Sequence, residues 1–337
     1  MQPTVLILGV CDRFGLAAAR AFANTGWRVL GQVCPGGVVP SDRRIKWLSV
    51  DLRDSQALAL AARGAAVVLH AANPPNSLWE QQAMPALEQA IALSIELQAL
   101  LMLPGDVCNF GSTMPALLLE DTPQHADTRK GWIRVAMERR LRQASETGAL
   151  NSVVVRAGDF VGSGRSSWFE RVLTKNLQHG KLSYPCASDV PTACAYLPDL
   201  AIAFERLARR ALLEPARFAP FDVFHFKGFS LSRTDWLAVL TPLAREQGWI
   251  EAQASLKCGT VPWALFRSLA WAVPQFRELL ETEYLWQTPH ALTNDKLCAM
   301  IGPEPHMPLS LAVKATLTDL GLLTLAPSDT QRLTMMV

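Results

Sequence analysis

Short apolar runs alternate with longer amphipathic segments along the chain from Thr4 to Arg156. Brief runs rich in valine, isoleucine and leucine are typical of buried strands. We expect strands at Thr4–Leu8, Arg28–Val33, Lys46–Val50, Ala66–His70, Leu100–Leu103 and Asn151–Arg156. We expect helices at Leu16–Asn24, Ser55–Ala62, Ala83–Leu97 and Thr128–Thr147. Strands spaced by helices predict an α/β fold, a doubly wound parallel sheet that binds ligands at the carboxyl ends of its strands.

The alternation weakens after Gly158, where proline and glycine recur between short elements. A helix at Leu197–Leu212 is expected to return to the sheet, and the chain from residue 226 onward is predicted to be mainly helical. We therefore place a first domain at residues 1–160, with 195–225 returning to it. Residues 161–194 and 226–337 would form a smaller, mostly helical region that closes over the ligand site.

Composition narrows the class of protein further. Half of the 337 residues are apolar and 18% are charged, which indicates a globular chain with a sizeable core. A net charge of +2 without a basic tract argues against nucleic-acid binding. No apolar run is long enough to span a membrane or to form the core of a signal peptide. The seven cysteines are scattered, which is typical of reduced thiols in the cytoplasm.

Small molecules are therefore the expected partners, with no nucleic acid and no membrane involved. Neither the seven cysteines nor the six histidines have the spacing of metal ligands, so no metal is expected. The region after residue 226 holds five of the ten tryptophans, and a homodimer through this region is left open. Residues 279–286 are predicted to serve in packing, because their apolar and aromatic positions have roughly helical spacing.

The turn after the first strand predicts a phosphate site. Gly9 allows a tight turn, and Gly15 allows the following helix to pack closely on the strand. Free N–H groups and the positive end of the helix dipole then face an anion. Asp12 stands where a G-x-x-G-x-x-G motif has its middle glycine. Its carboxylate would repel a pyrophosphate or fill the anion site itself by capping the helix, unless Arg13 pairs with Asp12 or the ligand.

Two further strand ends support a Rossmann-type dinucleotide site. Asp51 follows the third strand, where it would accept a hydrogen bond from an adenine amino group or cap a helix. The fourth strand ends in His70-Ala-Ala-Asn73, whose small side chains let a ribose or pyrophosphate lie against the backbone. His70 itself is predicted to be a hydrogen-bonded core histidine. NADP is favoured over NAD, because the second strand ends without an acid and Arg13, Arg43 and Arg44 could meet a 2′-phosphate.

These segments resemble the extended short-chain dehydrogenase/reductase superfamily, in its NAD-dependent epimerase/dehydratase group. The resemblance continues through Val107–Gly111, Glu120–Pro123, Arg156–Gly162 and Ala195–Ala201. It implies that the cofactor is lined by Gly9, Arg13, Phe14, Gly15, Asp51, Leu52, Ala71 and Ala72. Asp12 and Asn73 lie within the same segments and are included in the predicted cofactor site.

The catalytic pair of this family is missing. Its chemistry uses Tyr-x-x-x-Lys on the helix after the fifth strand, and none of the three tyrosines has a lysine four residues later. In the family register Lys130 replaces the tyrosine and Arg134 replaces the lysine. Asp106 follows the fifth strand, which usually ends in serine or threonine. We therefore expect Lys130, Arg134 and Asp106 to be the catalytic residues of this variant site.

Three interpretations of this helix compete. In the first, Lys130 is an acid/base or carbonyl-polarising group whose pKa is depressed by Arg134, while Arg134 keeps the cofactor ribose contact. In the second, the protein is a non-catalytic NAD(P)-binding regulator or scaffold. In the third, Lys130, Arg134 and Glu138 form a charged ladder on a solvated helix face. Chemistry would then use other groups near the end of the fifth strand, namely Asp106, Asn109, Ser112 and Thr113.

The predicted substrate contacts are Asn109, Asp159, Arg165 and Trp168. Arg165 would bind an anionic substrate and Trp168 would stack on it, although a core tryptophan at a helix start fits the same pattern. Asp159 lies at the end of the sixth strand, where a turn role is an equal alternative. The function predicted is that of an NAD(P)-binding epimerase/dehydratase-like oxidoreductase, acting on a small carbonyl- or hydroxyl-bearing substrate.

Overall fold

The computed structural model describes residues 2–37, 39, 41–74, 76–162, 164, 167–186, 188–271, 273, 276 and 279–323. Its centre is a seven-stranded sheet with the order β11-β7-β5-β4-β1-β2-β3, and every pairing in it is parallel. The strands are β1 (Thr4–Leu8), β2 (Arg28–Val33), β3 (Ile45–Ser49), β4 (Val67–His70), β5 (Leu100–Gly105), β7 (Ser152–Arg156) and β11 (Phe221–His225). This is the predicted doubly wound α/β fold.

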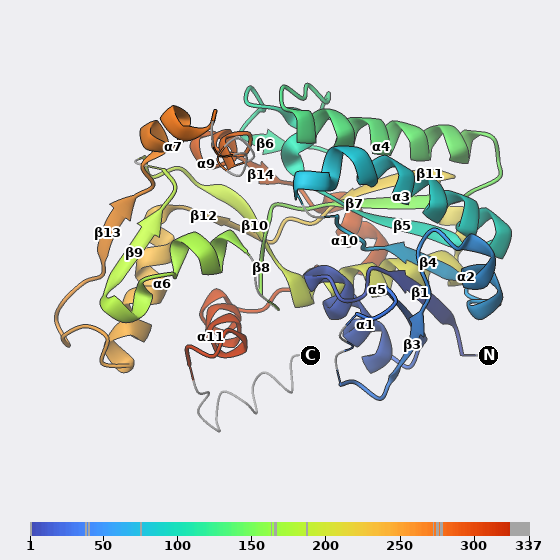
Figure 1. Cartoon of the computed structure of the whole chain (residues 1–337), viewed down its shortest axis with the longest axis horizontal. Coiled ribbons are helices and arrows are strands. Elements are labelled where there is room, and N and C mark those ends of the chain that lie inside the picture. The colour runs from blue at the N-terminus through green and yellow to red at the C-terminus, as the bar shows by residue number, and fades with distance from the viewer. Residues whose placement is uncertain are drawn as a thin grey trace.

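Helices cover both faces of the sheet, which explains why its central strands are buried along their whole length (Figure 1). On one face lie α1 (Arg13–Asn24) and α5 (Leu197–Leu213), with α10 (Asp295–Ile301) against α5. On the other lie α2 (Ser55–Ala61), α3 (Asn76–Leu97) and α4 (Arg129–Glu146). The helices predicted at these places are confirmed, and α1 and α3 begin earlier than the apolar pattern indicates.

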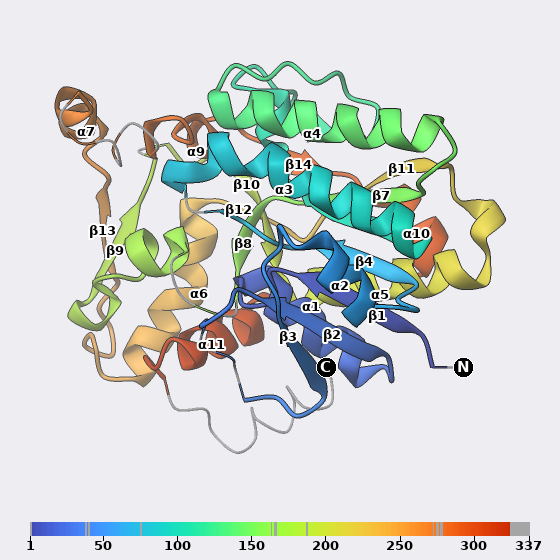
Figure 2. The same ribbon diagram turned by 45° about the vertical axis from the view of Figure 1, so that its right-hand side comes forward.

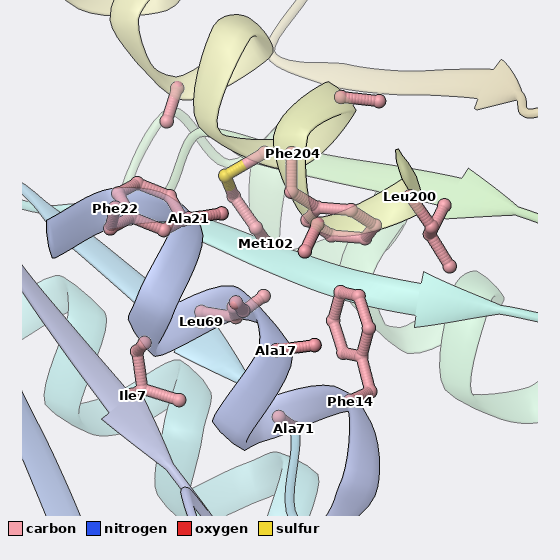
Figure 3. Close-up of a cluster of buried hydrophobic side chains, with 14 of the residues drawn as sticks. Ile7, Phe14, Ala17, Ala21, Phe22, Leu69, Ala71, Met102, Leu200 and Phe204 are labelled. Atoms are coloured by element: carbon pink, nitrogen blue, oxygen red, sulfur yellow. The ribbon is translucent and has the colours of Figure 1, made fainter. Parts of the chain in front are cut away.

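Small side chains on α1 let it approach α5 and the sheet closely. Ala17 and Ala21 are buried between α1 and the neighbouring elements, and Phe14 meets Phe204 of α5 with ring centroids 4.9 Å apart (Figure 3). The rings cross at 61°, an edge-to-face arrangement that favours aromatic pairs. This packing holds the start of α1, and therefore the turn before it, at a defined position.

A second region lies beside the main sheet (Figure 2). In it β10 (Thr192–Tyr196) pairs with β8 (Asp159–Val161) in parallel and with β12 (Phe229–Leu231) in antiparallel orientation. Two further parallel pairs join β9 (Lys181–Tyr184) to β13 (Lys257–Thr260) and β6 (Leu117–Leu118) to β14 (Ala291–Leu292). The remaining helices are α6 (Arg233–Glu246), α7 (Trp263–Leu269), α9 (Tyr284–Gln287) and α11 (Leu309–Asp319). Short 3₁₀ or π turns lie at Val107–Phe110 (η1), Phe169–Leu173 (η2), Leu177–His179 (η3) and Pro215–Arg217 (η4).

The chain after residue 226 is helical but also contributes the strands β12, β13 and β14, which the sequence pattern did not predict. Residues 195–225 contain α5 and β11, which extends the main sheet at its edge. The domain boundaries themselves stay a prediction. Within the described ranges, no helix combines the length and the apolar character that a membrane span requires.

Candidate functional site

A cavity of about 430 Å³ lies at the carboxyl ends of the sheet strands. The segments that follow β1, β4, β5 and β7 line it, together with α4 and residues before and within α9. The residues that the sequence predicted for the site and that line the cavity are Asp12, Arg13, Phe14, Ala71, Ala72, Asn73, Asp106, Lys130, Arg134, Asp159 and Trp168. Residues from four strand ends therefore converge, as expected for the ligand side of a doubly wound sheet.

Gly9 and Gly15 shape the turn between β1 and α1. Gly9 has a φ of +71°, and a Cβ on it would lie 2.3 Å from the Cα of Ala72. A Cβ on Gly15 would lie 2.5 Å from the carbonyl oxygen of Gly9. No side chain fits at either position, so the turn presses directly against the end of β4. The predicted helix–strand packing role of Gly15 is thereby explained.

Asp12 occupies the N-cap position of α1, but its side chain makes no capping hydrogen bond. Its Oδ2 instead accepts a hydrogen bond of 2.8 Å from the backbone N–H of Asn73. The alternative that its carboxylate caps the helix is therefore wrong, because the side chain reaches across to the segment after β4. Burial raises the pKa of Asp12 to about 6, although the hydrogen bond from Asn73 opposes the shift.

Arg13 connects α1 to the loop after β8. Its Nη2 donates a hydrogen bond of 2.5 Å to the carbonyl oxygen of Gly162. Burial lowers the pKa of its guanidinium, while Glu170 and Asp159 raise it. The predicted pairing of Arg13 with Asp12 or with a ligand stays untested.

Asp106 joins Lys130 and Arg134 in one charged cluster, which we call the cavity cluster. Arg134 Nε lies 3.1 Å from Asp106 Oδ2, and Lys130 Nζ lies 3.5 Å from the same oxygen. Arg134 also donates to the carbonyl oxygen of Pro104 at 3.2 Å. Asp106 Oδ1 accepts from the N–H of Cys108 at 2.8 Å and so begins η1. The three predicted catalytic residues therefore meet in space.

The pKa shifts of Asp106 and Lys130 show which groups of the cavity cluster are charged at neutral pH. Burial opposes ionisation of Asp106, but Lys130, Arg134 and the hydrogen bonds from Cys108 hold its pKa well below the ordinary value. The pKa of Lys130 is raised, mainly by Cys108 and to a smaller extent by Asp106. Burial and the positive charge of Arg134 act in the opposite direction but do not cancel this shift. The expected depression of the Lys130 pKa is therefore wrong. Lys130 is an ammonium ion at neutral pH, and it can donate a hydrogen bond but cannot act as a base.

The solvated ladder on α4 is also wrong. Glu138 is buried and pairs with Arg156 of β7, with Oε2 2.7 Å from Nη2. Asn109 is buried as well and donates to Glu138 Oε1 at 2.9 Å. We call Asn109, Glu138 and Arg156 the core cluster. The structure does not place Asn109 on the cavity wall, contrary to its expected substrate contact.

Six other predicted residues are absent from the cavity wall, namely Gly9, Gly15, Asp51, Leu52, Ser112 and Thr113. Asp51 forms an ion pair with Arg53 at 2.7 Å, and Leu52 packs on the hydrophobic core beside α2. The cap of α2 is Asp54, which accepts from the N–H of Ala57, so the alternative of Asp51 as a helix cap is wrong. Ser112 bonds to Asp127, and neither Ser112 nor Thr113 lines the cavity.

His70 lines the cavity and is 2% exposed. Its Nδ1 has no hydrogen-bond partner among the residues that the structure describes, so the expected hydrogen-bonded core histidine is corrected in this respect. Burial, together with the charge of Arg134, lowers its pKa to about 4. His70 is therefore neutral at physiological pH.

The substrate side holds two of the four predicted contacts. Asp159 begins β8, and burial raises its pKa to about 6 even though Lys130 opposes the shift. Trp168 packs edge to face on Trp286, with ring centroids 4.3 Å apart. Arg165 lies outside the described residues.

Sequence reasoning missed several lining residues. Trp79 of α3 donates from Nε1 to Asn73 Oδ1 at 2.8 Å, and the guanidinium of Arg134 lies 4.9 Å from its ring centroid. The segment predicted only to pack contributes Leu279, Thr282, Leu285 and Trp286 to the wall. Aromatic residues after the proline-rich loop were the only available signal for Trp79, and nothing local linked residues 279–286 to the site.

Comparison with known proteins gives a fold but no close relative. No protein-family model and no curated protein matches the sequence. The UDP-Glc/GlcNAc 4-epimerase of Campylobacter jejuni aligns with a TM-score of 0.71 at 12% identity, over 95% of this chain and 100% of that one. WbmH of Bordetella bronchiseptica, solved with NAD⁺, aligns with a TM-score of 0.68 at 13% identity, over 95% and 99%.

A candidate epimerase from Burkholderia cenocepacia J2315 aligns with a TM-score of 0.71 at 19% identity, over 94% of this chain and 97% of that one. The chain has the fold of these epimerase structures. The fold implied by the family resemblance is thus confirmed over nearly the whole chain, and at 12–19% identity the likeness extends to the fold alone.

Proposed function

We propose that this protein is an NAD(P)-binding oxidoreductase of the epimerase/dehydratase type, acting on a small carbonyl- or hydroxyl-bearing compound. One observation carries the proposal: a single cavity joins residues 12–14 at the start of α1, the small residues after β4 and the charged cavity cluster. The structural similarity to an epimerase and to an NAD⁺-bound protein supports the cofactor class.

The residues of the turn suit a dinucleotide in shape. Because no Cβ fits on Gly9, the backbone of the turn lies directly against Ala72, and the Asp12 side chain crosses from the start of α1 to the N–H of Asn73. Residues 12–14 and 71–73 would hold the diphosphate and ribose, and Arg134 would contact the nicotinamide ribose. Bound NAD(P) would supply a hydride acceptor or donor. The carboxylate of Asp12 suits this anion poorly above its pKa of about 6.

We infer a preference for NADP over NAD from the second strand. β2 ends without an acid that would hold a ribose 2′-hydroxyl, and Gln32 near its end accepts from the N–H of Gly9 at 3.0 Å. Arg44 is already paired with Asp42 at 2.7 Å, so Arg43 is the better candidate for a 2′-phosphate contact.

In this proposal, three side chains of the cavity have different roles in the reaction. The Lys130 ammonium would polarise a substrate carbonyl or hydrogen-bond a hydroxyl, in place of the family tyrosine. Asp159 has a pKa of about 6 and would hold or release the proton that the substrate oxygen exchanges. Asp106 orients both Lys130 and Arg134.

A non-catalytic NAD(P)-binding regulator is the second candidate function. The raised pKa of Lys130 favours it, because an ammonium paired with Asp106 does not replace the proton transfer of a tyrosine. Both functions require cofactor binding and differ in turnover.

The test combines titration calorimetry with a turnover assay. Wild-type protein should bind NADPH or NADH and change the nicotinamide absorbance with a substrate drawn from sugars, ketones and aldehydes. Lys130→Met should keep cofactor affinity within about threefold and lose turnover about 100-fold. Arg139→Met, at an exposed position of α4, is the matched control. Failure to bind either cofactor would overturn the proposal, and binding without turnover would favour the regulator.

A further inference from the structure

The cavity wall has a charged part and a mainly apolar, aromatic part. Charged groups from the sheet side lie on one part of it, while the C-terminal region supplies a wall that we call the aromatic end. The aromatic end consists of Trp168, Leu279, Thr282, Leu285 and Trp286. Leu285 and Trp286 are each 6% exposed and belong to the packed core, whereas Trp168, Leu279 and Thr282 are partly buried.

Trp168 is held in place by other rings. It packs edge to face on Trp286 at 4.3 Å and on Trp236 at 5.8 Å between centroids, with interplanar angles of 71° and 82°. Trp236 is 1% exposed and therefore anchors this arrangement in the core. The indole ring of Trp168 thus presents a preformed aromatic surface to the cavity.

The indole N–H of Trp168 has no hydrogen-bond partner among the described residues and is shielded from solvent. An indole nitrogen only donates, so its partner must be an acceptor. Leaving such a donor unpaired in a protein interior is unfavourable, and buried polar groups are rarely unpaired without a reason. A ligand oxygen beside Trp168 would satisfy it.

A sugar nucleotide fits these surroundings poorly. Its hydroxyl and phosphate groups all need polar partners when they leave water. The aromatic end offers the Trp168 N–H and the Thr282 hydroxyl among its described side chains. Two of the cations at the cavity are already engaged, Arg134 by Asp106 and the carbonyl oxygen of Pro104, and Arg13 by the carbonyl oxygen of Gly162, whereas Lys130 keeps spare donors on the charged part of the wall. The cavity of about 430 Å³ would also hold the part of the cofactor that residues 12–14 and 71–73 contact, so the space left for a substrate is at the small end of the ~300–1,000 Å³ range of ligand pockets.

We infer that the substrate is a compact aromatic carbonyl compound with a second acceptor oxygen on its ring, and not a sugar nucleotide. Its ring lies against Trp168 and Trp286, the ring oxygen accepts from Trp168 Nε1, and the carbonyl lies toward Lys130. This inference rests on the proposed function, because the carbonyl is the group on which Lys130 acts.

Matched ligands test the inference without turnover. Calorimetry on the full chain, with and without saturating NADPH, would compare 4-methoxyacetophenone with 4-ethylacetophenone, which has nearly the same shape but lacks the ring oxygen. The methoxy compound should bind about threefold to tenfold more tightly, and UDP-glucose should bind more weakly than either ketone. Equal affinity of the two ketones, tighter binding of UDP-glucose, or no ketone binding at millimolar concentration would overturn the inference.

Trp168→Phe keeps an aromatic wall and removes the donor. It should abolish the difference between the two ketones while 4-ethylacetophenone still binds. Trp132→Phe, at a side chain that is 60% exposed and away from the cavity, should leave the difference unchanged. The wild-type comparison stands even if Trp168→Phe does not fold. Binding of NADPH is measured separately, so a failure of the proposed cofactor role is distinguished from a failure of this inference.

Discussion

Two charged clusters lie one turn apart on the same face of α4 and differ in what surrounds them. The cavity cluster holds Lys130 and Arg134 against Asp106, with side chains 38%, 15% and 17% exposed. The core cluster holds Glu138 against Arg156, with side chains 6% and 3% exposed. The residue types are alike, so their environment decides their roles.

Within the core cluster, the pair of Glu138 and Arg156 is saturated with partners, whereas Asn109 Oδ1 has none among the described residues. Glu138 accepts hydrogen bonds from Asn109, Gln124 and both Nε and Nη2 of Arg156. Arg156 Nη1 also donates to the carbonyl oxygen of Glu120. In the cavity cluster, Asp106 is the only ion-pair partner of the Lys130 ammonium among the described residues, with Oδ2 3.5 Å from Nζ. A charge with spare donors beside a cavity is placed to meet a ligand, whereas a saturated buried pair holds strands and helices together.

The largest expected effect comes from breaking the core cluster. Glu138→Gln keeps the side-chain shape but leaves the Arg156 guanidinium buried without its counter-charge. We expect the free energy of unfolding to fall by about 3–5 kcal/mol, measured by urea denaturation. Glu88→Gln, which removes the partly exposed pair of Arg140 with Glu88, should cost less than about 1 kcal/mol. Similar losses in both variants would contradict the distinction between saturated and exposed pairs.

A smaller loss is expected in the cavity cluster. Arg134→Met removes one ion pair of Asp106 and the stacking of the guanidinium on Trp79, but Lys130 still faces Asp106. The expected loss in unfolding free energy is about 1–2 kcal/mol by the same measurement. A loss as large as that of Glu138→Gln would show that the cavity cluster is also a structural support.

The smallest effect tests whether charge at the cavity can be switched by pH. Burial raises the pKa of Asp12 to about 6, so its carboxyl is neutral below that pH and charged above it. NADH, which has no 2′-phosphate, should bind about fivefold more tightly at pH ~5.5 than at pH ~7.5, corresponding to ~1 kcal/mol of relieved repulsion.

Asp12→Asn is the control for this titration. It keeps an acceptor for the N–H of Asn73 and removes the charge, so the affinity for NADH should become nearly independent of pH. Asp159 also titrates near pH 6 in the same cavity, beside Lys130, Asp106 and Arg13. If the affinity of Asp12→Asn for NADH still depended on pH as strongly as that of the wild type, Asp159 and not Asp12 would be the group whose titration changes the affinity.

Local patterns predicted the main sheet well and its surroundings less well. Thr4–Leu8 and Arg28–Val33 were predicted with their observed bounds, because buried parallel strands are continuous apolar runs. The edge strand Phe221–His225 was missed, since its short run includes Asp222 and its pairing with β7 defines it. The short strands of the second region escaped prediction for the same reason.

The candidate site was predictable where it follows strand ends. Asp106 and Asp159 enter the cavity because the carboxyl ends of parallel strands meet at one edge of the sheet. Trp79 and Trp286 enter it through the packing of helices on other segments, and no spacing in the sequence connects them to that edge.

By itself the sequence determined the alternation of strands and helices, the glycines of the first turn and the loss of the Tyr-x-x-x-Lys pair, because these depend on neighbouring residues. Only the tertiary structure decided that Glu138 meets Arg156, that Asp106 gathers Lys130 and Arg134, and that the pKa of Lys130 rises. Ion pairing and proton affinity depend on burial and on distances between residues far apart in the chain, and local spacing encodes neither.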